Sequence, residues 1–281
     1  MTDHLLTMSA ETGRDLRLSI GVFDSGVGGL SVLRVLREHL PLASLVYVAD
    51  SGHAPYGEKT EAFITERSLS IAEFLLSQGA DVLVVACNTA TATSVQALRT
   101  RHPHLPIVGI EPGVKPAVAA SVNRKVGVLA TPGTLASERF ARLLAQHAGD
   151  AQILPQPCPG LAKAIEGGQL DAPVLRELVQ RFCAPLRQAG VDTVVLGCTH
   201  YPFVAPLIAE AMGPGVQLID TSDAVARQTV RLARRVKPEV EQTDGRPATA
   251  RTRLWTSGDV AALRHFCTPW MADEATFDAL P

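Results

Sequence analysis

Residues 79–89 read GADVLVVACNT, and residues 190–200 repeat the pattern as GVDTVVLGCTH. In both stretches a glycine suited to the end of a helix precedes a run of apolar residues. A cysteine and two polar residues follow each run. A short apolar run bounded in this way indicates a buried β-strand. Cys87 and Cys198 are therefore predicted to lie at matching positions, each directly beyond the end of a strand.

The internal repeat extends beyond the two cysteines. IGVFDSG at residues 20–26 corresponds to VGVLATP at 126–132, and Ile110-Glu111 corresponds to Ile219-Asp220. The offset between matching positions is nearly constant, which is hard to attribute to chance. We therefore predict an α/β fold of two similar lobes with parallel sheets, related by pseudo-two-fold symmetry. The active site is expected in the interlobe crevice, because ligands of such sheets bind beyond the carboxyl ends of the strands.

Short apolar runs alternate with helical patterns along the chain, which favours parallel sheets covered by helices. Strands are expected at residues 18–23, 44–49, 82–86, 107–110, 125–129, 152–154, 193–196 and 217–219. Helices are expected at 30–39, 61–78, 90–101, 135–147, 172–188, 203–212 and 222–236. We predict that residues 1–112 and 223–281 form the first lobe and residues 113–222 the second. Residues 237–253 are expected to form an exposed linker before a last strand and a short helix.

Composition narrows the class of protein. The chain has 281 residues, 46% of them hydrophobic, and a formal net charge of −2. This charge gives no sign of a nucleic-acid-binding surface. The polar N-terminus and the absence of a long apolar run predict a cytoplasmic protein with no membrane association. The five cysteines include no CxxC pair, so we expect neither a disulfide framework nor a structural metal site.

Two thiols in two related lobes suit a reaction that needs one acid–base group on each face of a substrate. Removal of a proton from one face of a carbon and its return to the other gives the mirror image, so the pattern predicts a racemase. A free thiol is mostly protonated near neutral pH and needs help to ionise. Each cysteine precedes a predicted helix, whose N-terminus favours an anion. The alternative is that Cys87 and Cys198 are small buried hydrophobic residues.

Other candidate residues surround the cysteines in sequence. His200 follows Cys198 closely and could tune its thiol or carry its proton. Asp24 follows the first strand and could bind an ammonium group, act on the Cys87 thiol, or only cap a helix. The glycines after Asp24 do not match a phosphate-binding loop, because no Gly-Lys-Ser/Thr follows them. Further polar candidates beyond strand ends are Asp50, Tyr56, Gly57, Asn88, Thr89, Thr199 and Thr131, of which the last corresponds to Ser25.

The chain resembles the glutamate racemase family, within the aspartate/glutamate racemase superfamily. The matching stretches are GVFDSGVGGL at residues 21–30, PYG at 55–57, ACNTA at 86–90, GIEP at 109–112 and GCTHYP at 197–202. The resemblance implies a cofactor-independent enzyme that interconverts L- and D-glutamate, supplies D-glutamate for peptidoglycan, and forms a homodimer. Two alternatives stay open: a racemase of the superfamily for another substrate such as aspartate, and a non-catalytic two-lobed amino-acid-binding protein.

The resemblance also implies roles for individual residues. Cys87 would act on D-glutamate and Cys198 on L-glutamate, with Asp24 and His200 as their partners. Glu166 and Asp50 are expected close behind these groups. The substrate would be lined by Asp24, Ser25, Tyr56, Gly57, Asn88, Thr89, Thr199 and His200. Some glutamate racemases are associated with inhibition of DNA gyrase.

Overall fold

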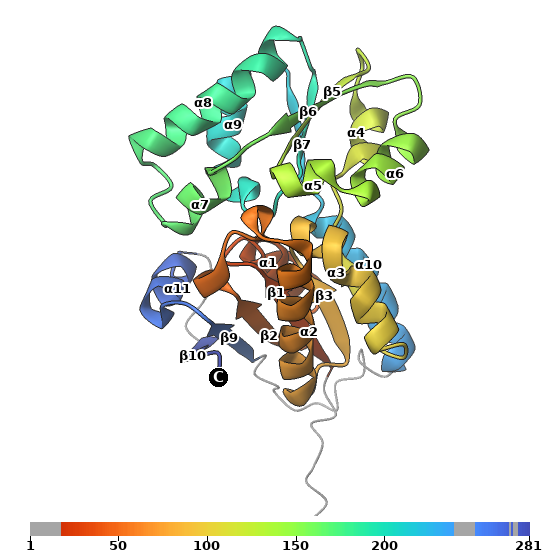
Figure 1. Cartoon of the computed structure of the whole chain (residues 1–281), viewed down its shortest axis with the longest axis vertical. Helices are drawn as coiled ribbons and strands as arrows, with labels where there is room; N and C mark the ends of the chain where they lie inside the picture. Colours follow the sequence, from red (N-terminus) through yellow and green to blue (C-terminus); the bar gives the residue numbers. More distant parts are fainter. Residues whose placement is uncertain (1–17, 239–250, 270, 272–274) are drawn as a thin grey trace, which may run out of the picture.

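Two parallel sheets form the framework of the protein in a computed structural model (Figure 1), which describes residues 18–238, 251–269, 271 and 275–281. The six-stranded sheet has the order β10-β9-β2-β1-β3-β4. Its strands, in that order, are Ala275–Ala279, Thr252–Thr256, Ser44–Ala49, Ser19–Asp24, Val82–Val85 and Ile107–Gly109. The four-stranded sheet has the order β6-β5-β7-β8. Its strands are Gln152–Pro157, Lys125–Ala130, Thr193–Leu196 and Gln217–Ile219.

The strand orders confirm the repeat inferred from the sequence. β2-β1-β3-β4 in the first lobe matches β6-β5-β7-β8 in the second, strand for strand. The register agrees as well, because Phe23 pairs with Val85 as Leu129 pairs with Leu196, at the last pairs of β1–β3 and β5–β7. The first sheet has two more strands than the second, because β9 pairs with β2 and β10 pairs with β9.

Helices cover both sheets. Around the first sheet lie α1 (Leu30–His39), α2 (Glu61–Ser77), α3 (Asn88–Arg101), α10 (Ser222–Val236) and α11 (Val260–Cys267). Around the second lie α4 (Val114–Ala120), α5 (Pro132–Ala136), α6 (Glu138–His147), α7 (Leu161–Glu166), α8 (Pro173–Gln188) and α9 (Ala205–Met212). Helix α10 follows the last strand of the second lobe and returns to the first lobe, where it packs against α1 and against strands β3 and β4. Short 3-10 turns at Ser51–His53, Tyr56–Glu58 and Tyr201–Val204 lie between regular elements.

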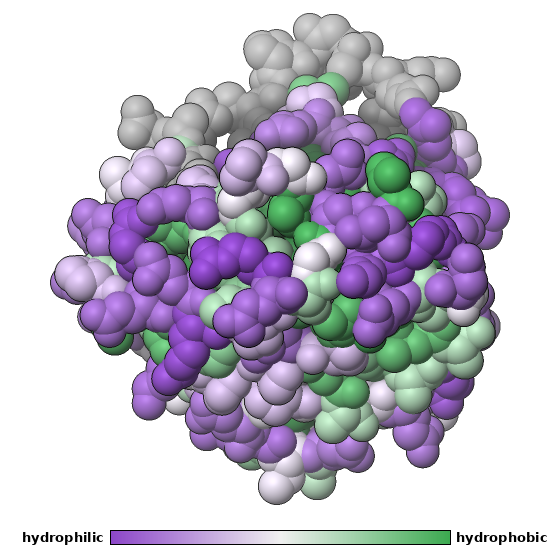
Figure 2. Space-filling model, turned by 90° about the horizontal axis from the view of Figure 1, so that it is seen from above, coloured by the Kyte–Doolittle hydropathy of each residue, from purple (hydrophilic) through white to green (hydrophobic). Residues whose placement is uncertain are grey.

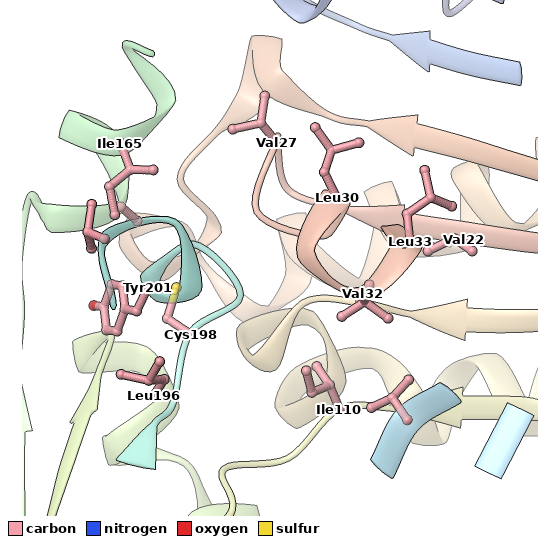
Figure 3. Packing of buried hydrophobic residues seen from close by; sticks show 14 of the residues in the cluster. Val22, Val27, Leu30, Val32, Leu33, Ile110, Ile165, Leu196, Cys198 and Tyr201 are labelled. Atoms are coloured by element: carbon pink, nitrogen blue, oxygen red, sulfur yellow. The ribbon is translucent and has the colours of Figure 1, made fainter. Parts of the chain in front are cut away.

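The two lobes share one hydrophobic cluster. Val22 and Leu33 of the first lobe belong to the same buried group as Ile165, Leu196 and Tyr201 of the second. Figure 3 shows Val27 facing Ile165 across the interface, with Cys198 beside Tyr201. Each of these side chains is less than a tenth exposed. Burial of this apolar surface stabilises the contact between the lobes and excludes water from the cysteine-bearing loops.

Several boundaries differ from those expected. Residues 135–147 are two helices, because Ser137 ends α5 and its hydroxyl accepts from Phe140 N at the start of α6. The segment 203–212 begins as a 3-10 turn. Helices α4 and α7 and strand β10 were not predicted. The N-terminal extension and most of the predicted linker at 237–253 lie outside the described residues.

The surface carries mostly hydrophilic side chains. In the view of Figure 2, apolar residues form small patches between them. Among the described residues, no helix is both long and apolar enough to cross a membrane.

Candidate active site

The two cysteines follow β3 and β7, which occupy equivalent places in the two sheets. Cys87 caps α3, and its sulfur accepts a hydrogen bond from Ala90 N at 3.5 Å. Cys198 lies in the turn before Tyr201. Both thiols are almost fully buried, with 5% and 6% of their surface exposed. Burial is the main cause that raises the pKa of Cys87, and a charge on Cys198 adds to that rise, so Cys87 lies within electrostatic range of Cys198.

Cys198 is the first member of a chain of three polar groups. Its sulfur lies 3.6 Å from His200 Nδ1, and His200 Nε2 lies 2.5 Å from Glu166 Oε1. Burial alone would lower the pKa of His200, but its contacts with the Cys198 sulfur and the Glu166 carboxylate raise it well above the usual value. His200 is therefore able to hold a positive charge beside the Cys198 sulfur. His200 contacts the Cys198 sulfur, and its role in tuning that thiol stays a prediction.

Glu166 joins the two lobes. It ends α7 in the second lobe, and its Oε1 accepts a hydrogen bond from Val27 N of the first lobe at 2.7 Å. Its Oε2 lies 3.4 Å from Ser51 Oγ. A Cβ at Gly26 would lie 1.9 Å from Glu166 Oε1. The glycine after Ser25 is therefore required so that this carboxylate can approach the backbone of the loop.

Asp24 lies on the Cys87 side of the site. It accepts hydrogen bonds from Ser25 N at 2.5 Å, Ser25 Oγ at 3.0 Å and Thr199 Oγ1 at 2.9 Å. Cys87 Sγ lies 3.7 Å from Ser25 Oγ. Burial raises the pKa of Asp24, and the positive charge of His200 opposes that rise. Asp24 therefore contacts Ser25 beside Cys87 and Thr199 beside Cys198. The expectation that it only caps a helix is wrong, because the N-cap of α1 is Gly29.

The two cysteines have different electrostatic surroundings. Burial, followed by the negative charge of Asp24, raises the pKa of Cys87 well above its usual value. Cys198 has an imidazole beside it in place of a carboxylate. The arrangement therefore favours a protonated thiol at Cys87.

Asp50 does not point to the cysteines but organises the loop that carries Tyr56. Its carboxylate accepts from Tyr56 OH at 2.5 Å, from Ser257 Oγ at 2.7 Å and from Arg67 Nη2 at 2.6 Å. Burial opposes ionisation, but these hydrogen bonds lower the pKa of Asp50 to about 2. Tyr56 is buried, and its hydroxyl is held by Asp50. The participation of Arg67 and Ser257 was not predicted.

Three threonine hydroxyl groups meet where α3 of the first lobe contacts α5 of the second. Thr89 Oγ1 lies 3.1 Å from Thr131 Oγ1 and 3.4 Å from Thr134 Oγ1. A Cβ at Gly57 would lie 3.0 Å from Thr131 Cβ, so the loop after Tyr56 closes over the same group. Thr134 was missed, although the spacing of TPGT at residues 131–134 places both threonines in the first turn of α5.

Asn88 has no hydrogen-bond partner for either amide atom within the described part of the chain, although it is buried. It lines a small cavity together with Thr134, Ile110 and Phe140. A buried carboxamide without a partner is costly, so this side chain is available to a ligand.

Across residues 18–238 and the described parts of the C-terminal segment, no group of three or more His, Cys, Asp or Glu side chains could hold a metal ion.

The three remaining cysteines, Cys158, Cys183 and Cys267, are buried free thiols. Burial is the main cause that raises the pKa of Cys158 and Cys267 to about 12 and that of Cys183 to about 11. All three stay thiols near neutral pH.

Comparison with known proteins identifies the family. The model of the Asp/Glu/Hydantoin racemase family matches residues 30–229. The chain belongs to this family. A glutamate racemase of Ectopseudomonas mendocina is 56% identical over 245 residues, which cover 87% of this chain and 91% of that protein. A glutamate racemase of Pseudomonas aeruginosa is 54% identical, over 85% and 88% of the two chains.

Solved structures of the family share the two-lobed fold. The Escherichia coli glutamate racemase, crystallised with L-glutamate and the activator UDP-MurNAc-Ala, matches with a TM-score of 0.82 at 32% identity, over 94% of this chain and 98% of that one. The Bacillus anthracis isoform RacE1 matches with a TM-score of 0.81 at 30% identity, over 94% and 97%. An aspartate racemase of Picrophilus torridus, at 18% identity and a TM-score of 0.52, shares the fold alone.

Proposed function

We propose that this protein is a glutamate racemase that interconverts L- and D-glutamate without a cofactor. The observation that carries the proposal is the pair of buried thiols at equivalent strand ends of two repeated lobes, Cys87 and Cys198. Each thiol has a different ionisable neighbour, Asp24 for one and His200 for the other. Relatives that are more than half identical over most of the chain and are named glutamate racemase support the choice of substrate.

In the proposed mechanism, Cys198 removes the α-proton of L-glutamate as a thiolate. His200, held protonated by Glu166, stabilises that thiolate before the transfer. Cys87, kept protonated by burial and by Asp24, delivers its proton to the opposite face of the α-carbon. The C–H bond on one face breaks as a new C–H bond forms on the other, and the product is D-glutamate. The reverse reaction exchanges the roles of the two thiols.

Negative charge develops on the α-carboxylate as the proton leaves, and neutral donors near the thiols can stabilise it. The Asn88 amide has no protein partner within the described residues, and Thr89 and Thr199 add hydroxyl groups on opposite lobes. Preorganised donors in a water-poor site are an effective source of transition-state stabilisation. We assign Ser25, Tyr56, Gly57 and Thr131 to the walls of the same substrate site.

Substrate entry requires the lobes to separate. In this structure the lobes touch directly, because Ser31 Oγ of α1 donates to Thr199 O at 3.0 Å and Thr199 Oγ1 donates to Asp24. Thr89 and Thr131 also meet across the interface. Closure around glutamate would replace some of these contacts with substrate contacts and exclude water.

The test compares substrates in the absence of any added cofactor. Purified protein is incubated with L-glutamate, D-glutamate or L-aspartate, and optical rotation is followed. Loss of rotation with both glutamate enantiomers and none with aspartate supports the proposal. Loss with aspartate alone would favour a racemase for that substrate. Binding of glutamate, seen by calorimetry, without any loss of rotation would favour an amino-acid-binding protein.

D-glutamate is a peptidoglycan building block, and we propose that this protein supplies it in the cytoplasm. The family membership and the relatives named glutamate racemase support this role. We further propose a homodimer, which light scattering of the purified chain tests directly. Neither a membrane nor a nucleic acid is needed for the activity.

A further inference from the structure

The C-terminal segment carries a hydroxyl group that reaches the loop beneath the substrate site. Ser257 follows β9, which pairs with β2 of the first sheet. Its Oγ donates to Asp50 Oδ1 at 2.7 Å and accepts from Gly52 N at 3.1 Å. One hydroxyl therefore bonds to both the buried anion and the backbone of the adjoining loop.

The two segments dock with little space between them. A Cβ at Gly52 would lie 2.6 Å from Ser257 O, and a Cβ at Gly258 would lie 3.1 Å from Ser51 Cβ. Ser257 N also donates to Ala49 O at 3.2 Å. Backbone therefore packs directly against backbone, and small residues on both sides allow the Ser257 hydroxyl to reach its partners.

The loop at residues 51–56, which Ser257 contacts, is connected both to the substrate site and to the support of His200. Asp50 Oδ2 accepts from Tyr56 OH at 2.5 Å and so fixes the buried tyrosine next to Gly57. Ser51 Oγ lies 3.4 Å from Glu166 Oε2, and Glu166 in turn contacts His200. A shift of residues 51–56 would therefore affect both the wall of the site and the group that supports the Cys198 thiolate.

We propose that Ser257 is a positioning residue for catalysis, which holds residues 51–56 in place through Asp50 and Gly52. This inference rests on the proposed function, because the consequence of the positioning is measured as racemisation. Ser257 itself contacts neither cysteine and is not a catalytic residue. Its hydroxyl is only one of several donors to Asp50, beside Arg67 and Tyr56, so its loss should loosen the loop and leave the fold intact.

The experiment compares Ser257→Ala, Ser257→Thr and the control Thr268→Ala. Thr268 lies in the same C-terminal segment, and among the described residues its exposed hydroxyl donates only to Arg264 O, one helical turn earlier. For Ser257→Ala we expect kcat/KM for glutamate to fall about tenfold, the effect of one lost hydrogen bond to a charged group. Ser257→Thr, which keeps the hydroxyl, should restore most of the activity, and Thr268→Ala should match the wild type.

Two further readouts separate positioning from general stability. Amide exchange at Gly52 should become faster in Ser257→Ala and stay unchanged in Thr268→Ala. In a double-mutant cycle, Tyr56→Phe should cost less in Ser257→Ala than in the wild type, because both changes act through Asp50. Additive effects, or equal losses in Ser257→Thr and Ser257→Ala, would overturn the proposal.

The outcomes for Ser257 and for the activity are distinguishable. If the wild-type protein does not racemise glutamate, the proposed function is wrong, and Gly52 exchange still decides whether Ser257 holds the loop. If the wild type is active and Ser257→Ala matches it in both kcat/KM and Gly52 exchange, the inference about Ser257 is wrong.

Discussion

The contact between Glu166 and His200 offers a sharp mutational test of the proposed proton transfer. Glu166 Oε1 lies 2.5 Å from His200 Nε2, and the same imidazole contacts the Cys198 sulfur through Nδ1. Glu166→Gln keeps the shape of the side chain and its acceptor for Val27 N. It removes the negative charge that helps to keep His200 protonated. The thiolate at Cys198 should therefore become harder to form.

The size of the effect follows from burial and charge. The side chains of His200 and Glu166 are only 2% and 14% exposed, so solvent screens their interaction weakly. A hydrogen bond to a charged group contributes about 1.5–3 kcal/mol, and each 1.4 kcal/mol or so corresponds to about a tenfold change. We therefore expect kcat/KM to fall about 10- to 100-fold. The fall must be equal in both directions, because the two enantiomers of glutamate have the same free energy.

The assay follows circular dichroism of L- and D-glutamate across a range of pH. Loss of the carboxylate lowers the pKa of His200 and disfavours the Cys198 thiolate, so the acid limb of kcat/KM for L-glutamate should move to higher pH. Glu177→Gln on the exposed face of α8 is the matched control. An unchanged kcat/KM and an unchanged acid limb in Glu166→Gln would refute the chain of Cys198, His200 and Glu166.

Two further predictions concern stability and loop geometry. The folded-state pKa of Asp50 is depressed from 3.8 to about 2, so its ionisation stabilises the fold by about 2 kcal/mol above pH 3.8. That contribution should disappear as the pH falls towards 2, and urea unfolding of Asp50→Asn should show a weaker dependence over this range. Gly26→Ala should displace the Glu166 carboxylate, since the new Cβ would lie 1.9 Å from it. Steady-state kinetics of Gly26→Ala should therefore show a loss at least as large as in Glu166→Gln, and wild-type activity would contradict the geometry.

The parts of the fold that the sequence predicts well are those with a strong local pattern. Helices α1 and α10 and strand β2 have the predicted bounds, because their apolar spacing and flanking residues are clear. The repeat predicts the matching places of Cys87 and Cys198, since equal strand order follows from equal sequence order. Helix α7 was missed because it has only six residues and begins after Gly160, whose φ of 77° lies in the left-handed region.

The parts of the site that escaped residue-by-residue reasoning depend on contacts between distant segments. Asp50 and Ser257 are 207 residues apart, and Val27 and Glu166 are 139 residues apart. No local pattern links such pairs, and only packing of the finished fold brings them together. Glu166 itself was expected near the site only from the family resemblance. Its contacts with Val27 and His200 appear only in the folded chain.

The central claim is that two thiols act on opposite faces of one carbon, and deuterium labelling tests it most directly. L-glutamate is incubated in D₂O with the wild-type protein and no cofactor, and both enantiomers are examined by NMR early in the reaction. The account predicts deuterium at the α-carbon of D-glutamate, while the remaining L-glutamate keeps its proton. Equal labelling of both enantiomers from the start, or racemisation that persists at the wild-type rate in both Cys87→Ser and Cys198→Ser, would contradict it.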